Sequence, residues 1–149
     1  MINSFKNYLR LGKAKRKTPD MVEAKALSDK ATDRLFYLTS KPINEKTAQF
    51  VFEDAYEAIR EAAQALMSKD GYKPYSHEAT ISFIKQFYKQ EFNEEELQKF
   101  DHYRQVRNNS VYKAIKITKE EAKEAQIFAK KFIRKTKSVL KDHNLCSLR

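Results

Sequence analysis

The strongest helical pattern in the chain is centred on Phe52-Glu53-Asp54-Ala55-Tyr56-Glu57-Ala58-Ile59-Arg60. Apolar residues recur around it in alternating steps of four and three, the spacing that places side chains on one face of an α-helix. The pattern predicts a helix from about Asn44 to Lys69. Its core-facing stripe consists of Ala48, Phe52, Ala55, Ile59, Ala62 and Leu66. Small alanine side chains at half of these positions should let neighbouring helices approach closely.

Signals for further helices lie on both sides of this stretch. Thr18-Pro19-Asp20 combines a capping residue, a proline suited to the first helical turn and an acid, which together indicate a helix start. Asn93 with Glu96, and Thr118 with Glu121, have the spacing of capping boxes. The helices expected in addition to the central one are 19–39, 76–90, one that opens at 93, and 118–141. These elements predict an all-α fold, an antiparallel bundle of four or five helices.

The composition supports one helical domain. A chain of 149 residues suits a single core. With only two glycines and three prolines, it has little material for the tight turns of an all-β or Rossmann-like fold. We expect a basic N-terminal arm at 1–17 that either extends an RNA contact or is flexible, one helical domain at 18–142 and a C-terminal tail at 143–149.

The formal net charge of +10 favours partners rich in phosphate or carboxylate, such as RNA. The alternative is that the lysines only solvate the surface. A single cysteine, Cys146, excludes an intrachain disulfide, and no apolar run is long enough for a transmembrane helix. We therefore expect a cytoplasmic protein that does not associate with membranes.

The stretch most suggestive of chemistry is Tyr103-Arg104-Gln105-Val106-Arg107-Asn108-Asn109-Ser110-Val111-Tyr112. We expect it to follow a helical run, with the Arg107–Asn108 pair at the helix end, and to end in a short polar break. Arg104 and Arg107 share a helix face, and two guanidinium groups there repel each other unless an anion lies between them. A phosphodiester would fit, because arginine binds phosphate oxygens through two parallel donors. The alternative is pairing with carboxylates of a neighbouring helix, such as Glu53, Asp54 or Glu57.

Other chemistry is less well supported. His77, His102 and His143 are far apart in sequence and lack the spacing of zinc ligands, so we expect no metal and no cofactor. The acids of Glu94-Glu95-Glu96 and Glu120-Glu121 are explained by their place in first helical turns. Further candidates for phosphate contacts are Lys113, Lys131 and Lys135. For the lysines near the end of the last helix, a favourable interaction with the helix dipole is a sufficient alternative.

The pairing of Arg107 with Asn108, followed by a ring side chain five positions after the arginine, resembles the signature of HEPN domains. The segments 52–60 and 71–77, the number and order of helices, and the late position of the motif also agree with that family, over roughly residues 20–140. The resemblance implies a HEPN-like helical bundle that forms homodimers. It also implies metal-independent RNA cleavage in active members, and often a nucleotidyltransferase partner in a toxin–antitoxin pair.

In this resemblance Arg107 takes the place of the motif arginine and Asn108 that of the polar residue, while Tyr112 stands where the family has histidine. These three are the candidate catalytic residues, with Arg104 as a phosphate contact. Neither His77 nor His102 lies at the motif's spacing. The substitution leaves enzymatic activity undecided. One hypothesis is an RNA-binding or RNase-type toxin component, and the other is an inactive module that docks a nucleotidyltransferase. A helical nucleic-acid binder unrelated to HEPN is a third.

Overall fold

The structure, a computed structural model, describes the backbone of residues 2–147 and the side chains of residues 2–142. Of the expected tail 143–149, only the backbone up to Ser147 is described, and the side chains of His143 and Cys146 lie outside the described part. The elements in chain order are α1 (Phe5–Arg10), β1 (Ala14–Arg16), α2 (Met21–Thr39), α3 (Ala48–Asp70), β2 (Tyr72–Pro74), α4 (His77–Phe87), α5 (Glu94–Lys113) and α6 (Lys119–Ser147).

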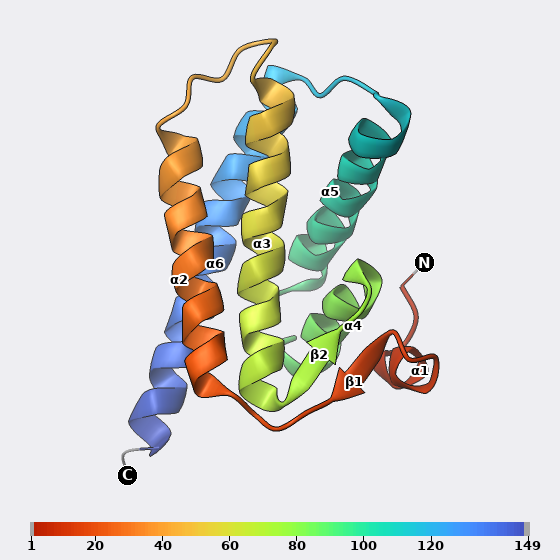
Figure 1. Cartoon of the computed structure of the whole chain (residues 1–149), viewed down its shortest axis with the longest axis vertical. Coiled ribbons are helices and arrows are strands. Elements are labelled where there is room, and N and C mark those ends of the chain that lie inside the picture. Colours follow the sequence, from red (N-terminus) through yellow and green to blue (C-terminus); the bar gives the residue numbers. More distant parts are fainter. Residues whose placement is uncertain (1, 148–149) are drawn as a thin grey trace.

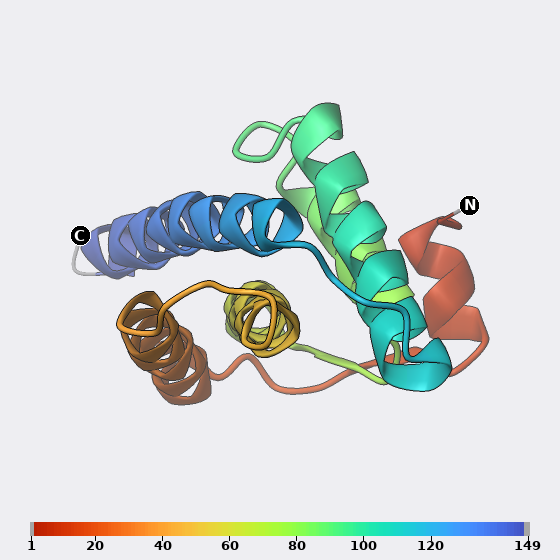
Figure 2. The same ribbon diagram turned by 90° about the horizontal axis from the view of Figure 1, so that it is seen from above.

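Helix α3 lies at the centre of the molecule and contacts α2, α4, α5 and α6. Figure 1 shows α2 and α3 as an antiparallel pair, while α6 runs in the same direction as α3. Seen from above, α2, α3 and α6 form one group, and α4 and α5 form a second layer beside α3 (Figure 2). The predicted all-α class is therefore confirmed, and a two-stranded ribbon of β1 and β2 is added to it.

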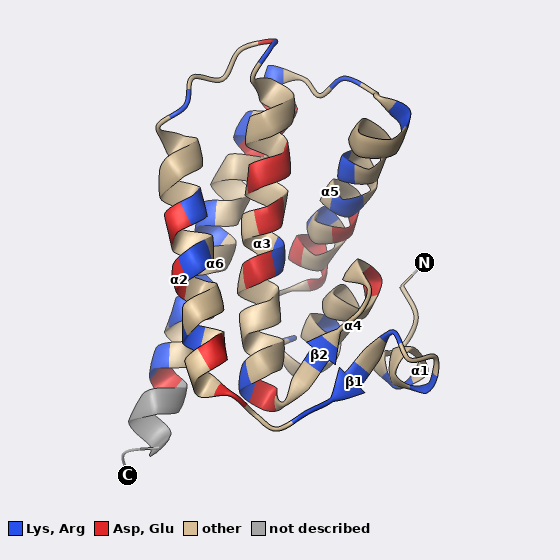
Figure 3. Cartoon of the chain, viewed as in Figure 1, with Lys and Arg blue, Asp and Glu red and all other residues tan. Residues whose placement is uncertain are grey.

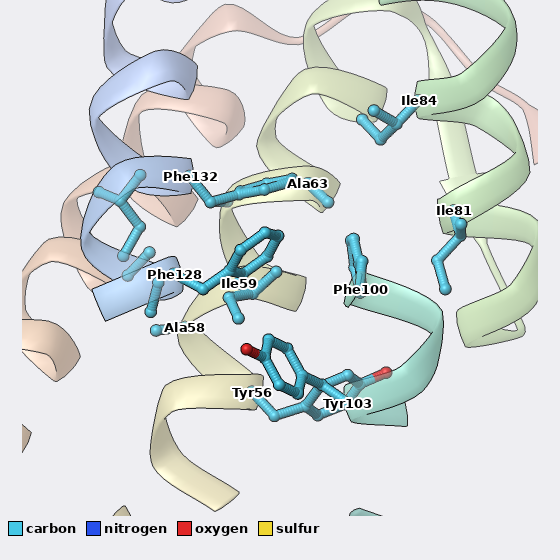
Figure 4. Close-up of a cluster of buried hydrophobic side chains, with 14 of the residues drawn as sticks. Tyr56, Ala58, Ile59, Ala63, Ile81, Ile84, Phe100, Tyr103, Phe128 and Phe132 are labelled. Atoms are coloured by element: carbon cyan, nitrogen blue, oxygen red, sulfur yellow. The ribbon is translucent and has the colours of Figure 1, made fainter. Parts of the chain in front are cut away.

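The core forms where the apolar stripe of α3 meets the aromatic residues of α5 and α6 (Figure 4). All six predicted stripe residues of α3 are fully buried. The ring of Phe100 packs edge-on against those of Tyr56 and Phe132, with centroids 6.1 and 5.5 Å apart. This packing fixes the position of α5 relative to α3, and with it the position of the arginines that α5 carries.

The helix ends agree with the sequence signals at some points and differ at others. Both capping boxes form: in the first, the backbone N–H groups of Asn93 and Glu96 each donate to the other's side chain at 2.9 Å. At α2, however, the N-cap is Asp20, whose Oδ1 accepts from the Glu23 N–H at 2.8 Å. Asp20 lies past Pro19 and outside the helix, so the expected start at Pro19 was two residues early.

The helix of the Arg104–Tyr112 stretch is longer than expected. The polar run Asn108-Asn109-Ser110 is not a break, because α5 continues through it to Lys113. It ends only at Ala114, whose φ of 54° and ψ of 31° lie in the left-handed region. Arg107 and Tyr112 therefore lie on one continuous helix.

Replacing Ala114 with glycine is expected to stabilise the protein by about 0.5–1 kcal/mol. A left-handed conformation costs an L-residue roughly 1–2 kcal/mol, and glycine avoids this cost. Part of the gain is offset because glycine also raises the conformational entropy of the unfolded chain. Urea unfolding monitored by circular dichroism would measure the change. As a comparison, Ser110→Gly lies inside the helix and should destabilise it by a similar amount, and an Ala114→Gly variant no more stable than wild type would contradict the prediction.

The basic N-terminal segment is folded onto the domain. α1 contacts α4, and β1 pairs antiparallel with β2. Gly71, with φ of 86°, ends α3 and lets the backbone turn into β2. A Cβ atom at Gly71 would lie 2.7 Å from the backbone oxygen of Lys17, so this close approach requires glycine. In the part of the chain that the structure describes, no helix is both long and apolar enough to cross a membrane.

Candidate functional site

Arg104, Arg107 and Asn108 lie on the C-terminal half of α5, and all three side chains are partly buried. Their place follows from the local sequence, because Tyr103 and Phe100 of the same helix are buried against α3 and turn the arginine face toward the groups of α3 and α4. Arg104 and Arg107 thus lie on the same side of α5, as their spacing predicts.

Arg104 is paired with carboxylates, but not with those that the sequence suggested. Its Nε lies 2.8 Å from Oδ1 of Asp101, and its Nη1 lies 3.4 Å from Oε1 of Glu78 at the start of α4. Of the three alternative partners expected from the sequence, Glu57 binds Arg60 and Asp54 binds Arg34. Glu53 forms no ion pair with Arg104 or with any other described residue. Arg104 therefore ties α5 to α4 and has part of its donor set occupied.

Arg107 differs from Arg104 in having no carboxylate partner among the described residues. Its Nη1 donates to Oδ1 of the neighbouring Asn108 at 3.3 Å, a hydrogen bond that orients the guanidinium but leaves its charge unneutralised. Partly buried arginines are normally paired, because removing a charge from water without a counter-ion is costly. Arg107 is accordingly the arginine best placed to receive an anion from outside the chain.

The structure brings a histidine to these arginines that sequence spacing did not suggest. His77 is the first residue of α4, placed there because Ser76 caps the helix by accepting from the Ala79 N–H at 3.1 Å. A hydrogen bond of 2.8 Å joins His77 Nδ1 to the hydroxyl of Tyr56, a fully buried residue of α3. Tyr56 thereby fixes the orientation of the imidazole. The sequence signals for this position were the cap and glycine turn that position α4, and the resemblance of residues 71–77 to a HEPN loop that often carries a Ser-His pair.

Charge and burial act on His77 in the same direction. Burial is the largest cause, followed by the nearby positive charges of Arg60, Arg107 and Arg104, and together they lower the pKa of His77 below its ordinary value despite the opposing charge of Glu57. The imidazole is therefore neutral at neutral pH. Within the described residues no group hydrogen-bonds its Nε2. A neutral, oriented imidazole that lies near enough to Arg107 to be affected by its charge can accept a proton from a group bound to that guanidinium.

Tyr112 and Lys113 lie at the C-terminal end of α5 and point into solvent, Tyr112 with 76% of its surface exposed. Five residues along a helix correspond to a rotation of roughly 140° and a rise of about 7.5 Å, so Tyr112 does not share the face of Arg107. We call the group of Arg107, Asn108 and His77 the Arg–His cluster. In a single chain, Tyr112 consequently does not belong to this cluster.

Lys131 and Lys135 belong to a different part of the surface. Both lie on α6 and bind Glu96, with Nζ to Oε1 distances of 3.6 and 2.6 Å. Glu96 is eleven residues before Arg107 on α5, which corresponds to roughly 16 Å along the helix. These ion pairs join α6 to the start of α5. The two lysines therefore have a structural role, independent of any contact with phosphate.

The donor groups favour anion binding over metal binding. In residues 2–142 no group of three or more histidine, cysteine, aspartate or glutamate side chains is placed to hold a metal ion. His102, the other described histidine, is exposed on α5 beside Tyr103 and takes no part in the Arg–His cluster. What the cluster offers is one unpaired guanidinium, one amide and one imidazole.

Comparison with known families gives one result. The family model described as HEPN domain matches residues 24–139, most of the chain and all of the elements that form the Arg–His cluster. No curated protein matches the sequence.

Proposed function

Since this chain belongs to the HEPN domain family, we propose that it is an RNA-binding, RNase-type component of a two-component system. The observation that carries the proposal is the partly buried Arg107, which has no carboxylate partner among the described residues. Its charge acts on a nearby histidine that Tyr56 holds in place. A guanidinium suits a phosphodiester, and an imidazole suits the removal of a proton from a hydroxyl. Arg104 and Asn108 support this site, Arg104 through its remaining donors.

The proposed reaction uses the RNA's own 2′-hydroxyl as nucleophile. Nε2 of His77 takes the hydroxyl proton in the tautomer in which Nδ1–H donates to the Tyr56 oxygen, which can accept as well as donate. The 2′-oxygen forms a bond to phosphorus, and the bond from phosphorus to the 5′-oxygen breaks. The products are a 2′,3′-cyclic phosphate and a 5′-hydroxyl, whose proton comes from solvent. Arg107 stabilises the charge that develops on the phosphoryl oxygens.

We further propose that the protein acts as a homodimer beside a nucleotidyltransferase partner, as the family resemblance implies. In this arrangement the exposed Tyr112 and Lys113 of one copy would complete the site around Arg107 of the other. Tyrosine, with an ordinary pKa near 10, is a poor base at neutral pH but can donate a hydrogen bond or stack on a base. Lys131 and Lys135 could add contacts to phosphates of the RNA backbone if the RNA displaces the carboxylate of Glu96 from these two lysines.

The test is an RNase assay with purified protein in EDTA. Wild type should cleave single-stranded RNA, and Arg107→Ala should lose at least about tenfold in kcat/KM because one charged hydrogen-bond donor to the transition state is removed. Arg134→Ala, which removes an exposed arginine from α6, is the matched control and should cleave normally. Tyr112→Phe reports whether the hydroxyl is needed. Cleavage unaffected by Arg107→Ala, or absent in wild type, would reject the RNase proposal.

One observation favours a second function, the inactive module that docks a partner protein. Phe36, Tyr37 and Phe50 are 79, 56 and 60% exposed, and Tyr37 and Phe50 border an apolar pocket between α2 and α3. Phe83, Tyr88 and Phe92 are not available for such a contact, because all three are buried in the chain's own core. Exposed aromatic groups around a pocket are typical of protein–protein contacts. This function would be favoured by tight partner binding without any cleavage.

A further inference from the structure

A basic surface next to the Arg–His cluster is formed by the ribbon of β1 and β2. The two strands pair in a register that places Lys15 directly opposite Lys73. Figure 3 shows Lys and Arg residues along both strands, at the end of the molecule where the chain enters α2 and leaves α3. Like charges in directly opposed positions of a ribbon repel each other, so the arrangement is unfavourable unless something relieves it.

The charge of the ribbon is only weakly offset within the described part of the chain, where Glu23 lies near enough for Lys73 to help lower its pKa. Lys13, Lys15, Arg16 and Lys73 are exposed and form no ion pair with a described residue, whereas Lys17, the next residue along, binds Glu23. The ammonium groups of Lys15 and Lys73 instead lie 5.5 and 5.6 Å from the ring centroid of Tyr75. Lys15 and Lys73 thus share one aromatic ring and have no ion-pair partner among residues 2–142.

Tyr75 is held in place while its ring stays accessible. Its backbone N–H donates to the Lys13 oxygen at 2.8 Å, which extends the ribbon by one further bond. The side chain is nevertheless 54% exposed. Tyr72, the first residue of β2, packs its ring against Phe5 and Phe83 and lies partly buried against the core. Tyr72 therefore anchors the ribbon to the core, whereas the ring of Tyr75 is exposed to solvent.

We propose that Lys15, Lys73 and Tyr75 form a binding site for single-stranded RNA. A phosphate of the backbone relieves the repulsion between the two lysines and draws their ammonium groups off the ring. The freed face of Tyr75 then stacks on a base. Cations that follow the backbone, combined with an aromatic ring, are the usual means of holding single strands without regard to sequence, because every base has a π-face.

The location connects this site to the proposed chemistry, and in taking RNA as the ligand the inference rests on the proposed function. Only Ser76 separates Tyr75 from His77, so the two Cα atoms are at most about 7 Å apart. A base stacked on Tyr75 therefore brings the next phosphates of the strand toward His77 and Arg107. The ribbon would deliver the substrate to the Arg–His cluster.

The test uses a fluorescent twelve-nucleotide oligouridylate with 2′-O-methyl groups throughout, which blocks the nucleophile and keeps binding separate from cleavage. Fluorescence anisotropy should show that Lys15→Gln/Lys73→Gln weakens binding at least tenfold at about 0.1 M salt. The slope of log affinity against log salt should become shallower by roughly 1.4, because each phosphate contact on a single strand contributes about 0.7. Tyr75→Ala should weaken binding at least about fivefold, and Tyr75→Phe should bind like wild type.

Matched controls change exposed side chains elsewhere. Lys46→Gln/Lys123→Gln neutralises two exposed lysines away from the ribbon, and Ile127→Ala removes a large exposed side chain of α6. Both should bind like wild type. The inference is overturned if the ribbon variants bind no worse than these controls, if wild type does not bind, or if phosphatidylserine vesicles bind through the same lysines without needing Tyr75. Ribbon-dependent binding without cleavage of unmodified RNA would uphold it and reject only the RNase proposal.

Discussion

Replacing His77 with asparagine is expected to lower RNA cleavage by roughly 100-fold to 10,000-fold, the range typical for loss of a general acid or base. Asparagine can still hydrogen-bond the Tyr56 hydroxyl but cannot take up a proton at neutral pH. The measurement is kcat/KM for a single-stranded RNA in EDTA. The chain offers a matched control in His102→Asn, because His102 is exposed and lies outside the Arg–His cluster. Equal activity of the two variants would remove His77 from the mechanism.

The pH profile provides a second readout of the same role. A base is active in its neutral form, and the pKa of His77 is lowered by burial and by the charges of Arg60, Arg107 and Arg104. Cleavage should therefore rise with pH through a midpoint below the ordinary value of about 6.5 and be level by neutrality. Tyr56→Phe, which removes the hydroxyl that positions the ring, should lower the rate and move this midpoint. A merely structural role would leave the midpoint unchanged.

A fall in cleavage at low pH can also arise from unfolding of the protein, and this cause has to be distinguished from protonation of His77 in the folded chain. Because the pKa of His77 is lower in the folded than in the unfolded chain, the unfolded chain binds more protons below pH 6.5. The contribution of His77 to stability is thus present above that pH and is lost as the pH falls. Thermal unfolding at each pH, for wild type and for His77→Asn, identifies the range in which the rate reports chemistry and not folding.

The candidate site shows what a sequence pattern can and cannot give. Arg107 and Asn108 were found because they are neighbours on one helix, where spacing alone determines the shared face. His77 precedes Arg107 by thirty positions and comes near it only because α4 packs against α5 and α3. That meeting depends on the turn at Gly71, the cap at Ser76 and the buried Tyr56. These residues lie in segments that resemble the family, but their distance in sequence from Arg107 does not reveal the contact between helices. A histidine of this kind cannot be recognised from its distance to the arginine in sequence.

The same contrast holds for the fold. Local signals succeeded where the energetics are local, as in the capping box of Asn93 and Glu96 and in the apolar stripe of α3. They failed at the end of α5, where Asn108-Asn109-Ser110 reads as a break although the helix runs on to Lys113. The ribbon was missed as well, because its strands are three residues long and pair across more than fifty residues of chain. Strands so short carry no alternation of polar and apolar residues to detect.

Replacing Arg34 with methionine is expected to destabilise the protein by about 3 kcal/mol, the largest stability effect we anticipate. Arg34 reaches from α2 to α3, where its Nε and Nη2 lie 3.1 and 2.9 Å from the two carboxylate oxygens of Glu61. Only 2% of Glu61 is exposed. Removing one partner of a buried ion pair leaves an uncompensated charge, which costs roughly 3–5 kcal/mol. Lys30, 3.6 Å from Glu61, should offset a small part of this loss.

The double variant Arg34→Met/Glu61→Met decides whether the isolated charge is the cause. If it is, removing Glu61 as well should recover much of the lost stability, since a buried ion pair can often be replaced by apolar side chains at little cost. Urea unfolding of wild type, both single variants and the double variant then forms a double-mutant cycle, with an expected coupling of about 2 kcal/mol. Additive losses, or a loss below about 1 kcal/mol for Arg34→Met, would show that α2 is held to α3 by apolar packing alone.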